Sequence, residues 1–203
     1  MIRDPYNIII TGVGGQGNVL AARILGNILA LQGYYLTIGE TFGASQRGGS
    51  VMSHLRVSKK SAWSPQMPKG KADLVVALEP IESLRVMAQY GNSETAVVSN
   101  TRAVDPVGVI SGDLKYPTME ELNASLLQLC SKIYFIDATE EAIKLGNPIL
   151  SNIIMIGAVA GLNVIPIEES NFELVMSTSL PPDKLKVNME GFKLGKNITS
   201  KVS

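Results

Sequence analysis

The sequence contains few of the residues that build cysteine and histidine sites, and each shortage excludes a class of protein. Its 203 residues include one cysteine, Cys130, one histidine and one tryptophan. A single cysteine excludes a disulfide within the chain, an iron–sulfur cluster held by several cysteines and a multi-cysteine zinc site. A chain without structural disulfides is typical of a reducing compartment, so we expect a cytoplasmic protein.

Charge of either sign is scarce, and the two signs are balanced. Charged residues make up 18% of the chain, and 18 lysines and arginines match 18 acidic residues. Because no net positive charge is present, neither nucleic acid nor an anionic membrane surface is an expected partner.

No hydrophobic run is long enough to indicate a membrane span. Residues 145–167 carry no charge, but polar residues and prolines leave only the ten non-polar residues from Ile153 to Leu162 uninterrupted. A run of that length predicts a buried helix of a globular fold. Its Gly157 and Gly161 would let another backbone approach closely, either that of the chain's own sheet or that of another subunit.

Six short runs rich in β-branched residues predict strands: Ile8–Thr11, Tyr34–Gly39, Val51–Val57, Asp73–Leu78, Thr95–Ser99 and Ile133–Ile136. Helical patterns separate most of them, as in a three-layer α/β/α, Rossmann-like domain with a mostly parallel sheet. The third run is the exception, because the ten residues 41–50 before it are too few for a parallel crossover. We therefore expect this run to be antiparallel or at an edge, which makes the sheet mixed.

Capping patterns mark several helix starts. They are Glu79 with Pro80, Thr118 with Glu121, and Asp137 with Glu140. Near the C-terminus, Leu185, Met189 and Phe192 repeat at helical spacing. We expect residues 1–180 to form one α/β domain and residues 181–203 to form a short docking helix with a frayed tail.

The first predicted strand runs into a glycine-rich turn, GVGGQG, at residues 12–17. Gly12, Gly14 and Gly17 have the G-x-G-x-x-G spacing of dinucleotide-binding turns, and Glu40 lies where a ribose-binding acid is expected. The same turn could hold another phosphate group on helix N–H groups, or merely join a strand tightly to a helix. These residues alone leave all three interpretations open.

A second glycine-rich segment, ETFGASQRGGSV, occupies residues 40–51 after the second predicted strand. It should emerge at the same end of the sheet as the first turn, where open α/β sheets bind ligands. Ser45 and Gln46 supply polar groups, and Arg47 supplies a fixed positive charge. An ordinary nucleotide-binding domain has no need of this segment, which favours a more specialised site on a loop.

Four motifs in this order resemble the gamma-type domain of the 2-oxoacid:ferredoxin oxidoreductases, and most of all its indolepyruvate-oxidising branch. The motifs are GVGGQG, ETFGASQRGGSVMSHLRVS, ADLVVALEPIESLR and GNPILSNIIMIGA, and the resemblance covers about residues 6–195. It implies oxidative decarboxylation of aryl 2-oxoacids such as indolepyruvate, giving an arylacetyl-CoA, CO2 and reduced ferredoxin. It also implies a large alpha subunit as partner, which carries thiamine diphosphate, magnesium and iron–sulfur clusters, with CoA as co-substrate.

The residues agree with that division of labour. One cysteine cannot hold a four-iron cluster, and the only Gly-Asp pair, Gly112–Asp113, lacks the asparagines that follow it in a diphosphate–metal site. No residue forms a convincing nucleophile or acid–base pair. We therefore expect no catalytic residue, bound cofactor or metal in this chain, and no activity without the partner.

Two groups of residues are candidates for the site. Those that could bind a phosphate or CoA are Gly12, Gly14, Gly15, Gly17 and Arg47. Those expected at the active-site cleft or the subunit interface are Ser45, Gln46, Gly48, Gly49, Glu79, Asn147 and Asn152. Helix capping is an alternative role for Glu79 and for the two asparagines.

Two other functions stay open on the sequence. A stand-alone NAD(P)- or FAD-binding protein of the Rossmann type would bind its nucleotide without a partner. A non-enzymatic module that regulates a 2-oxoacid oxidoreductase would associate with the enzyme without being required for turnover.

Overall fold

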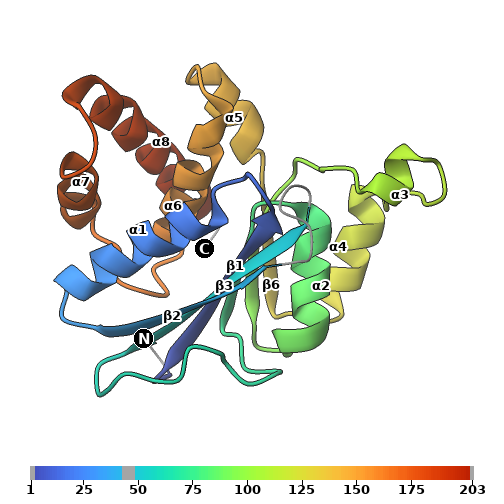
Figure 1. Ribbon diagram of the computed structural model, residues 1–203, viewed down its shortest axis with the longest axis horizontal. Coiled ribbons are helices and arrows are strands. Elements are labelled where there is room, and N and C mark those ends of the chain that lie inside the picture. Colours follow the sequence, from blue (N-terminus) through green and yellow to red (C-terminus); the bar gives the residue numbers. More distant parts are fainter. Residues whose placement is uncertain (1–2, 43–48, 202–203) are drawn as a thin grey trace.

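Six strands form one sheet in the computed structural model, which describes residues 3–42 and 49–201 (Figure 1). They are β1 (Tyr6–Val13), β2 (Tyr35–Phe42), β3 (Ser50–Ser58), β4 (Leu74–Ala77), β5 (Ala96–Asn100) and β6 (Lys132–Ile136). Their order across the sheet is β2-β3-β1-β4-β5-β6. Each strand coincides with one of the six predicted runs, with its ends shifted by a few residues.

The sheet is mixed, as the short connection before β3 predicts. β3 runs antiparallel to both of its neighbours, β1 and β2, whereas β4, β5 and β6 follow the direction of β1. β2 therefore points the same way as β1, although β3 lies between them. The carboxyl ends of these five parallel strands meet at one end of the sheet, the carboxyl edge, and their amino ends meet at the amino edge.

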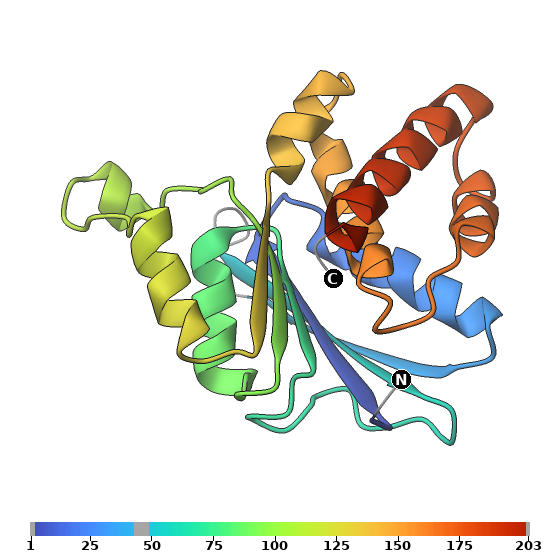
Figure 2. The same ribbon diagram turned by 180° about the vertical axis from the view of Figure 1, so that it is seen from behind.

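Helices cover both faces of the sheet (Figures 1 and 2). One layer, the α6 face, contains α1 (Asn18–Leu31), α5 (Ala138–Lys144), the 3-10 turn η1 (Pro148–Leu150), α6 (Ser151–Gly161), α7 (Glu169–Ser177) and α8 (Pro182–Ser200). The other layer, the α2 face, contains α2 (Pro80–Tyr90) and α4 (Met119–Leu127), while α3 (Val107–Ile110) projects away from the sheet. The predicted three-layer α/β/α fold is confirmed.

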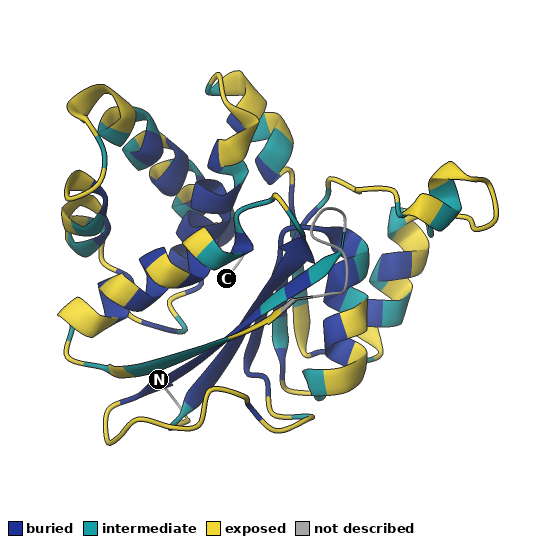
Figure 3. Ribbon diagram, viewed as in Figure 1, coloured by how far each residue is buried: buried dark blue, intermediate teal, exposed yellow. Residues whose placement is uncertain are grey.

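The strands divide the hydrophobic core into two clusters, one on each face. Ile8 and Ile10 pack under the α6 face, whereas Ile9 between them packs under the α2 face. Because both faces are covered, β1 is buried along its whole length and has three consecutive isoleucines at its centre. Figure 3 shows this buried strand in the centre of the sheet.

The C-terminal helix packs against α6 through glycines on both helices. A Cβ atom on Gly195 would lie 1.9 Å from the carbonyl oxygen of Ile154, and one on Gly157 would lie 2.1 Å from that of Phe192. Two helix backbones approach this closely only where side chains are missing. The glycines of α6 therefore contact α8 of the same chain, and not the sheet or another subunit as expected.

Other local expectations also differ from the structure. α8 has 19 residues and ends at Ser200, so it is much longer than the short helix with a frayed tail that the sequence predicts. Asp137 is the N-cap residue of α5, as predicted, but its side chain makes no capping bond within the described residues and instead accepts a hydrogen bond from the hydroxyl of Thr101 at 2.5 Å. Neither α3 nor α7 is predicted by the sequence. The capping box of Thr118 and Glu121 at α4 is confirmed.

Replacing Gly195 with alanine should destabilise the fold, because the new methyl group would force α6 and α8 apart. We expect Gly195→Ala to lower the free energy of unfolding by about 2 kcal/mol, measured by urea denaturation. Gly191→Ala on the same helix is the matched control, since its Cβ atom would come no closer than 3.6 Å to any neighbour. The control should be neutral or stabilising by up to about 1 kcal/mol. Equal effects of the two substitutions would contradict this packing.

Candidate functional site

The turn between β1 and α1 shapes the carboxyl edge. Gly15 and Gly17 have φ angles of 102° and 84°, a left-handed backbone that other residues adopt only with strain. The N–H of Gly14 donates to the carbonyl oxygen of Gly49 at 2.9 Å, so the turn contacts the segment that enters β3. The first glycine turn and the end of the second glycine-rich segment therefore lie together.

Gln16 fixes the turn against the neighbouring strands. Its side-chain oxygen accepts from the N–H of Val13 at 2.8 Å, and its side-chain nitrogen donates to the carbonyl oxygen of Leu78 at 3.0 Å, just after β4. The same carbonyl accepts from Nδ2 of Asn100 at 3.1 Å, at the end of β5. Asn100 in turn donates to the hydroxyl of Thr139 at 2.9 Å, in α5. This network holds the carboxyl ends of β1, β4 and β5 in one arrangement.

A groove of about 490 Å³ opens beside the glycine turn. Its lining consists of Gly14, Gly15, Gly17, Asn18, Val19, Leu20, Arg23 and Val51. Within the described residues, the N–H groups of Gly15 and Gly17 donate no hydrogen bond, and the first N–H groups of α1 have no partner inside the helix. Arg23 adds an exposed guanidinium, and no acidic side chain belongs to the lining. The groove therefore favours an anion.

Two buried asparagines beside the turn have unused polar atoms. A Cβ atom on Gly17 would lie 2.5 Å from Nδ2 of Asn152, whose residue is 1% exposed. Neither that nitrogen nor Oδ1 of Asn18 has a hydrogen-bond partner among the described residues. Since buried polar atoms are almost always paired, these two atoms indicate a functional region. Asn152 belongs to the first turn of α6, so α6 directly supports the glycine turn.

Glu79 lies at the carboxyl edge but is enclosed by protein. Its residue is fully buried, and the carboxylate caps α2 by accepting from the N–H of Glu82 at 3.0 Å. It also accepts from the hydroxyl of Tyr116 and, at 3.3 Å, from the N–H of Val104. Burial raises the pKa of Glu79, and these hydrogen bonds oppose that rise in part. The capping role predicted as an alternative is therefore present.

The described candidates share one edge without lining one cavity. Three of the four predicted glycines line the groove, and a Cβ atom on the fourth, Gly12, would lie 2.6 Å from Oε1 of Gln16. Asn147 is exposed and caps η1 by accepting from the N–H of Ile149 at 3.0 Å. The remaining candidates, Ser45, Gln46, Arg47 and Gly48, lie outside the described residues, so their placement stays a prediction.

Gln16, Asn18 and Arg23 belong to the site, although no sequence motif predicts them. Arg23 stands one turn after Leu20 on α1, so helical periodicity could have placed it beside the turn. No sequence signal marks Gln16, because the bond from its side chain to Leu78 depends on the pairing of β1 with β4.

His54 does not line this groove and is fully buried in β3. The edge of its ring contacts Tyr90 of α2, with the ring centroids 5.0 Å apart and the planes at 79°. Neither ring nitrogen has a hydrogen-bond partner among the described residues. Burial lowers the pKa of His54, which favours the neutral ring.

Metal ligation and membrane crossing find no support in residues 3–42 and 49–201. No histidine, cysteine, aspartate and glutamate side chains gather there in groups of three or more that could hold a metal ion. Nor does any helix in these ranges combine the length and apolarity needed to cross a bilayer.

Replacing Gly17 with alanine should be more damaging than replacing Gly15. Both substitutions carry the backbone strain of a positive φ, about 1–2 kcal/mol. Only the methyl group on Gly17 would collide with a side chain, that of Asn152, whereas the space beside Gly15 is open. We expect Gly17→Ala to lose about 1 kcal/mol more free energy of unfolding than Gly15→Ala in urea. An equal loss would show that Asn152 moves aside freely.

Acid should destabilise the fold through His54. The unfolded residue titrates near pH 6.5 and the folded one at a lower pH, so the unfolded state binds more protons as the pH falls below about 6.5. Stability should therefore fall between pH 7.5 and 5.5 by up to about 1.4 kcal/mol per pH unit. His54→Phe should remove the contribution of His54 to the dependence of unfolding free energy on pH. The contributions of other titrating groups, such as Glu79, should remain. An identical slope for both proteins, measured by urea denaturation, would contradict the buried neutral ring.

The chain matches the family model described as pyruvate ferredoxin/flavodoxin oxidoreductase over residues 7–198. Its relatives include indolepyruvate oxidoreductase subunit IorB from Thermococcus kodakarensis, which is 37% identical. The protein of the same name from Pyrococcus horikoshii is 38% identical. In both cases the match covers 94% of this chain and 94% of the relative.

A solved structure has the same fold. The 2-oxoglutarate:ferredoxin oxidoreductase from Magnetococcus marinus, with 2-oxoglutarate, coenzyme A and succinyl-CoA bound, aligns with a TM-score of 0.79 at 19% identity. The alignment covers 99% of this chain and 32% of that chain. The resemblance drawn from the sequence motifs is confirmed, and the chain belongs to the pyruvate ferredoxin/flavodoxin oxidoreductase family.

Proposed function

We propose that this chain is the small subunit of an enzyme that oxidatively decarboxylates aryl 2-oxoacids, with indolepyruvate as the typical substrate. The products would be an arylacetyl-CoA, CO2 and reduced ferredoxin. The observation that carries the proposal is the anion-favouring groove at the glycine turn, in a chain that belongs to this oxidoreductase family. The names of the relatives support the aryl substrate.

The groove is suited to a phosphate of CoA. Unpaired N–H groups at the start of α1 and the guanidinium of Arg23 would bind phosphate oxygens. Leu20 and Val51 supply apolar surface for the rest of the ligand. Arg47, predicted from the sequence to meet a CoA phosphate or the substrate carboxylate, would add a second positive charge.

The stand-alone dinucleotide alternative is less well supported by the strand order. In dinucleotide-binding sheets the strand with the ribose-binding acid lies next to the first strand. Here β3 separates β2 from β1, so Glu40 lies two strands from the glycine turn, roughly 10 Å across the sheet. A nucleotide bound at the turn would not meet its carboxylate as in that fold.

The residues of this chain do not fit the redox cofactors of the reaction. Its one thiol, Cys130, is buried, and no acidic or histidine cluster for a metal is found in the described residues. We propose, as the family resemblance implies, that thiamine diphosphate, magnesium and iron–sulfur clusters belong to a large partner subunit, which would also pass electrons to ferredoxin. This chain would bind CoA and form one side of the active-site cleft between the two subunits.

Reconstitution tests the proposed function. The chain should be co-expressed without oxygen with a candidate large subunit, and reduction of a viologen dye by indolepyruvate plus CoA should be followed. We expect turnover only when both subunits are present. Turnover by the large subunit alone would indicate a regulatory module. NAD binding by the isolated chain, with no complex and no turnover, would indicate that the glycine turn is a dinucleotide-binding site.

Arg23→Ala in the reconstituted enzyme should weaken CoA binding. We expect the KM for CoA to rise about tenfold with little change in kcat, because a charge-assisted contact to phosphate is lost. Lys184→Ala removes an exposed positive charge from α8 and is the matched control. An unchanged KM for CoA in the Arg23 variant would exclude this residue from the CoA site.

A further inference from the structure

A second hollow, of about 490 Å³, lies at the amino edge, at the opposite end of the sheet from the glycine turn. It is bounded by the starts of β1, β4, β5 and β6 and by the segment that follows α6. The lining residues are Arg3, Tyr6, Asp73, Ser93, Glu94, Ala96, Ser131, Lys132, Tyr134, Leu162 and Val164. None of them belongs to the candidate site at the carboxyl edge.

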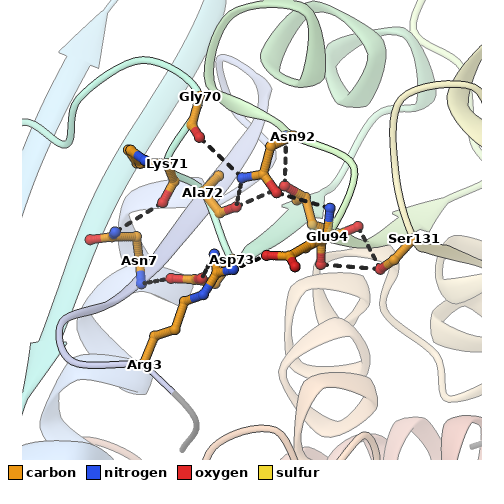
Figure 4. A network of polar contacts seen from close by, with 10 residues as sticks. Arg3, Asn7, Gly70, Lys71, Ala72, Asp73, Asn92, Glu94 and Ser131 are labelled. Atoms are coloured by element: carbon orange, nitrogen blue, oxygen red, sulfur yellow. Dashed lines mark hydrogen bonds and ion pairs between the residues drawn. The ribbon is translucent and has the colours of Figure 1, made fainter.

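One wall of this hollow is held by ionic contacts (Figure 4). Nη1 of Arg3 lies 3.2 Å from Oδ1 of Asp73, and its other terminal nitrogen contacts Glu94. Asp73 is buried and accepts from the backbone N–H of Asn7 at 2.8 Å through its second oxygen. Ser131 donates to the carbonyl oxygen of Glu94 at 3.1 Å. The starts of β1, β4, β5 and β6 are thus fixed to one another, so the hollow is preformed.

Several polar groups in the lining, among them three large side chains, are not used by this network. The ammonium of Lys132 and the hydroxyls of Tyr6 and Tyr134 make no hydrogen bond or ion pair with any of residues 3–42 and 49–201. Burial, and then the charge of Asp73, raises the pKa of Tyr6, so its hydroxyl stays protonated and can donate. Lys132 and Tyr134 belong to one strand and lie two residues apart, so both side chains are on the α6 face.

The charges and the apolar surface together define the kind of ligand. Lys132 offers a positive charge. The side chain of Glu94 is 68% exposed, and its one ion pair among the described residues is with the partly exposed Arg3, so it offers a negative charge. Leu162, Val164 and the tyrosine rings give the hollow an apolar floor. A ligand with one sign of charge would meet a like charge here, whereas a zwitterion with an apolar group would satisfy both signs.

We propose that this hollow, the amino-edge site, binds a free amino acid with an aromatic side chain. The carboxylate would contact Lys132, the ammonium would contact Glu94, and the aromatic ring would lie on the floor beside Tyr134. Because the site is at the opposite end of the sheet from the glycine turn, its occupant would not compete with CoA. The site itself is argued without the function proposed above, and only its independence of CoA rests on that function.

Calorimetric titration of the full chain tests the site, with L-tryptophan as the probe. Tryptamine lacks the carboxylate and indole-3-propionate lacks the ammonium, so each should bind at least tenfold more weakly. Tryptophan binding should be unchanged by an excess of CoA. Equal binding of tryptophan and either analogue would overturn the zwitterion assignment, and absence of measurable tryptophan binding would overturn the site.

Two substitutions locate the bound amino acid. Lys132→Met keeps the aliphatic stem and Glu94→Gln keeps the shape, so circular dichroism should show unchanged folding. Each should weaken tryptophan binding at least tenfold. Lys186→Met, on the exposed surface of α8, is the matched control and should have no effect. Unchanged binding in both test variants, or displacement of tryptophan by CoA, would place the ligand elsewhere and contradict the proposal.

Discussion

The carbonyl oxygen of Leu78 is the point on which the geometry of the carboxyl edge depends. It accepts from Gln16 of the glycine turn and from Asn100 at the end of β5, so three strand ends share one acceptor. The other end of the Gln16 amide closes the turn on Val13. Without this bond the left-handed glycine turn would not be fixed to β4, and the first N–H groups of α1 would not be held toward one groove.

The C-terminal helix α8 also affects the position of the glycine turn, because it packs on α6 and α6 contacts the turn. Glycines let α8 lie directly on the backbone of α6, which sets the position of that helix. Asn152, in the first turn of α6, then contacts Gly17. Asn152 therefore supports the groove, although it is far from the turn in the sequence. A glycine is required at position 17 both because of the left-handed backbone and because a side chain would collide with Asn152.

The two ends of the sheet are built from different groups. At the carboxyl edge, glycines expose backbone N–H groups and Arg23 adds a positive charge, which suits a phosphate. At the amino edge, side chains of both signs surround an apolar floor, and Arg3 joins Asp73 to Glu94. One fold thus presents two chemically distinct surfaces, one at each end of the sheet.

Local patterns in the sequence predict much of this structure. Strand runs, helix caps and the short connection that makes β3 antiparallel are all set by residues close together in the sequence. Thr118 and Glu121 are an example, since their spacing alone defines the capping box. The spacing of Asp137 and Glu140 predicts the helix start but not the bond, since the Asp137 carboxylate accepts from Thr101, which is distant in sequence. The contacts of Gln16, Asn152 and Gly195 were likewise beyond prediction, since each depends on elements brought together only by folding.

The groove at the glycine turn is the proposed CoA site of the assembled enzyme. Hydrogen–deuterium exchange of the peptide covering residues 14–20, in the complex with and without CoA, tests this most directly. We expect slower exchange of this peptide when CoA is added, because the N–H groups at the start of α1 become hydrogen-bonded. Unchanged exchange there at a CoA concentration that saturates turnover would contradict it.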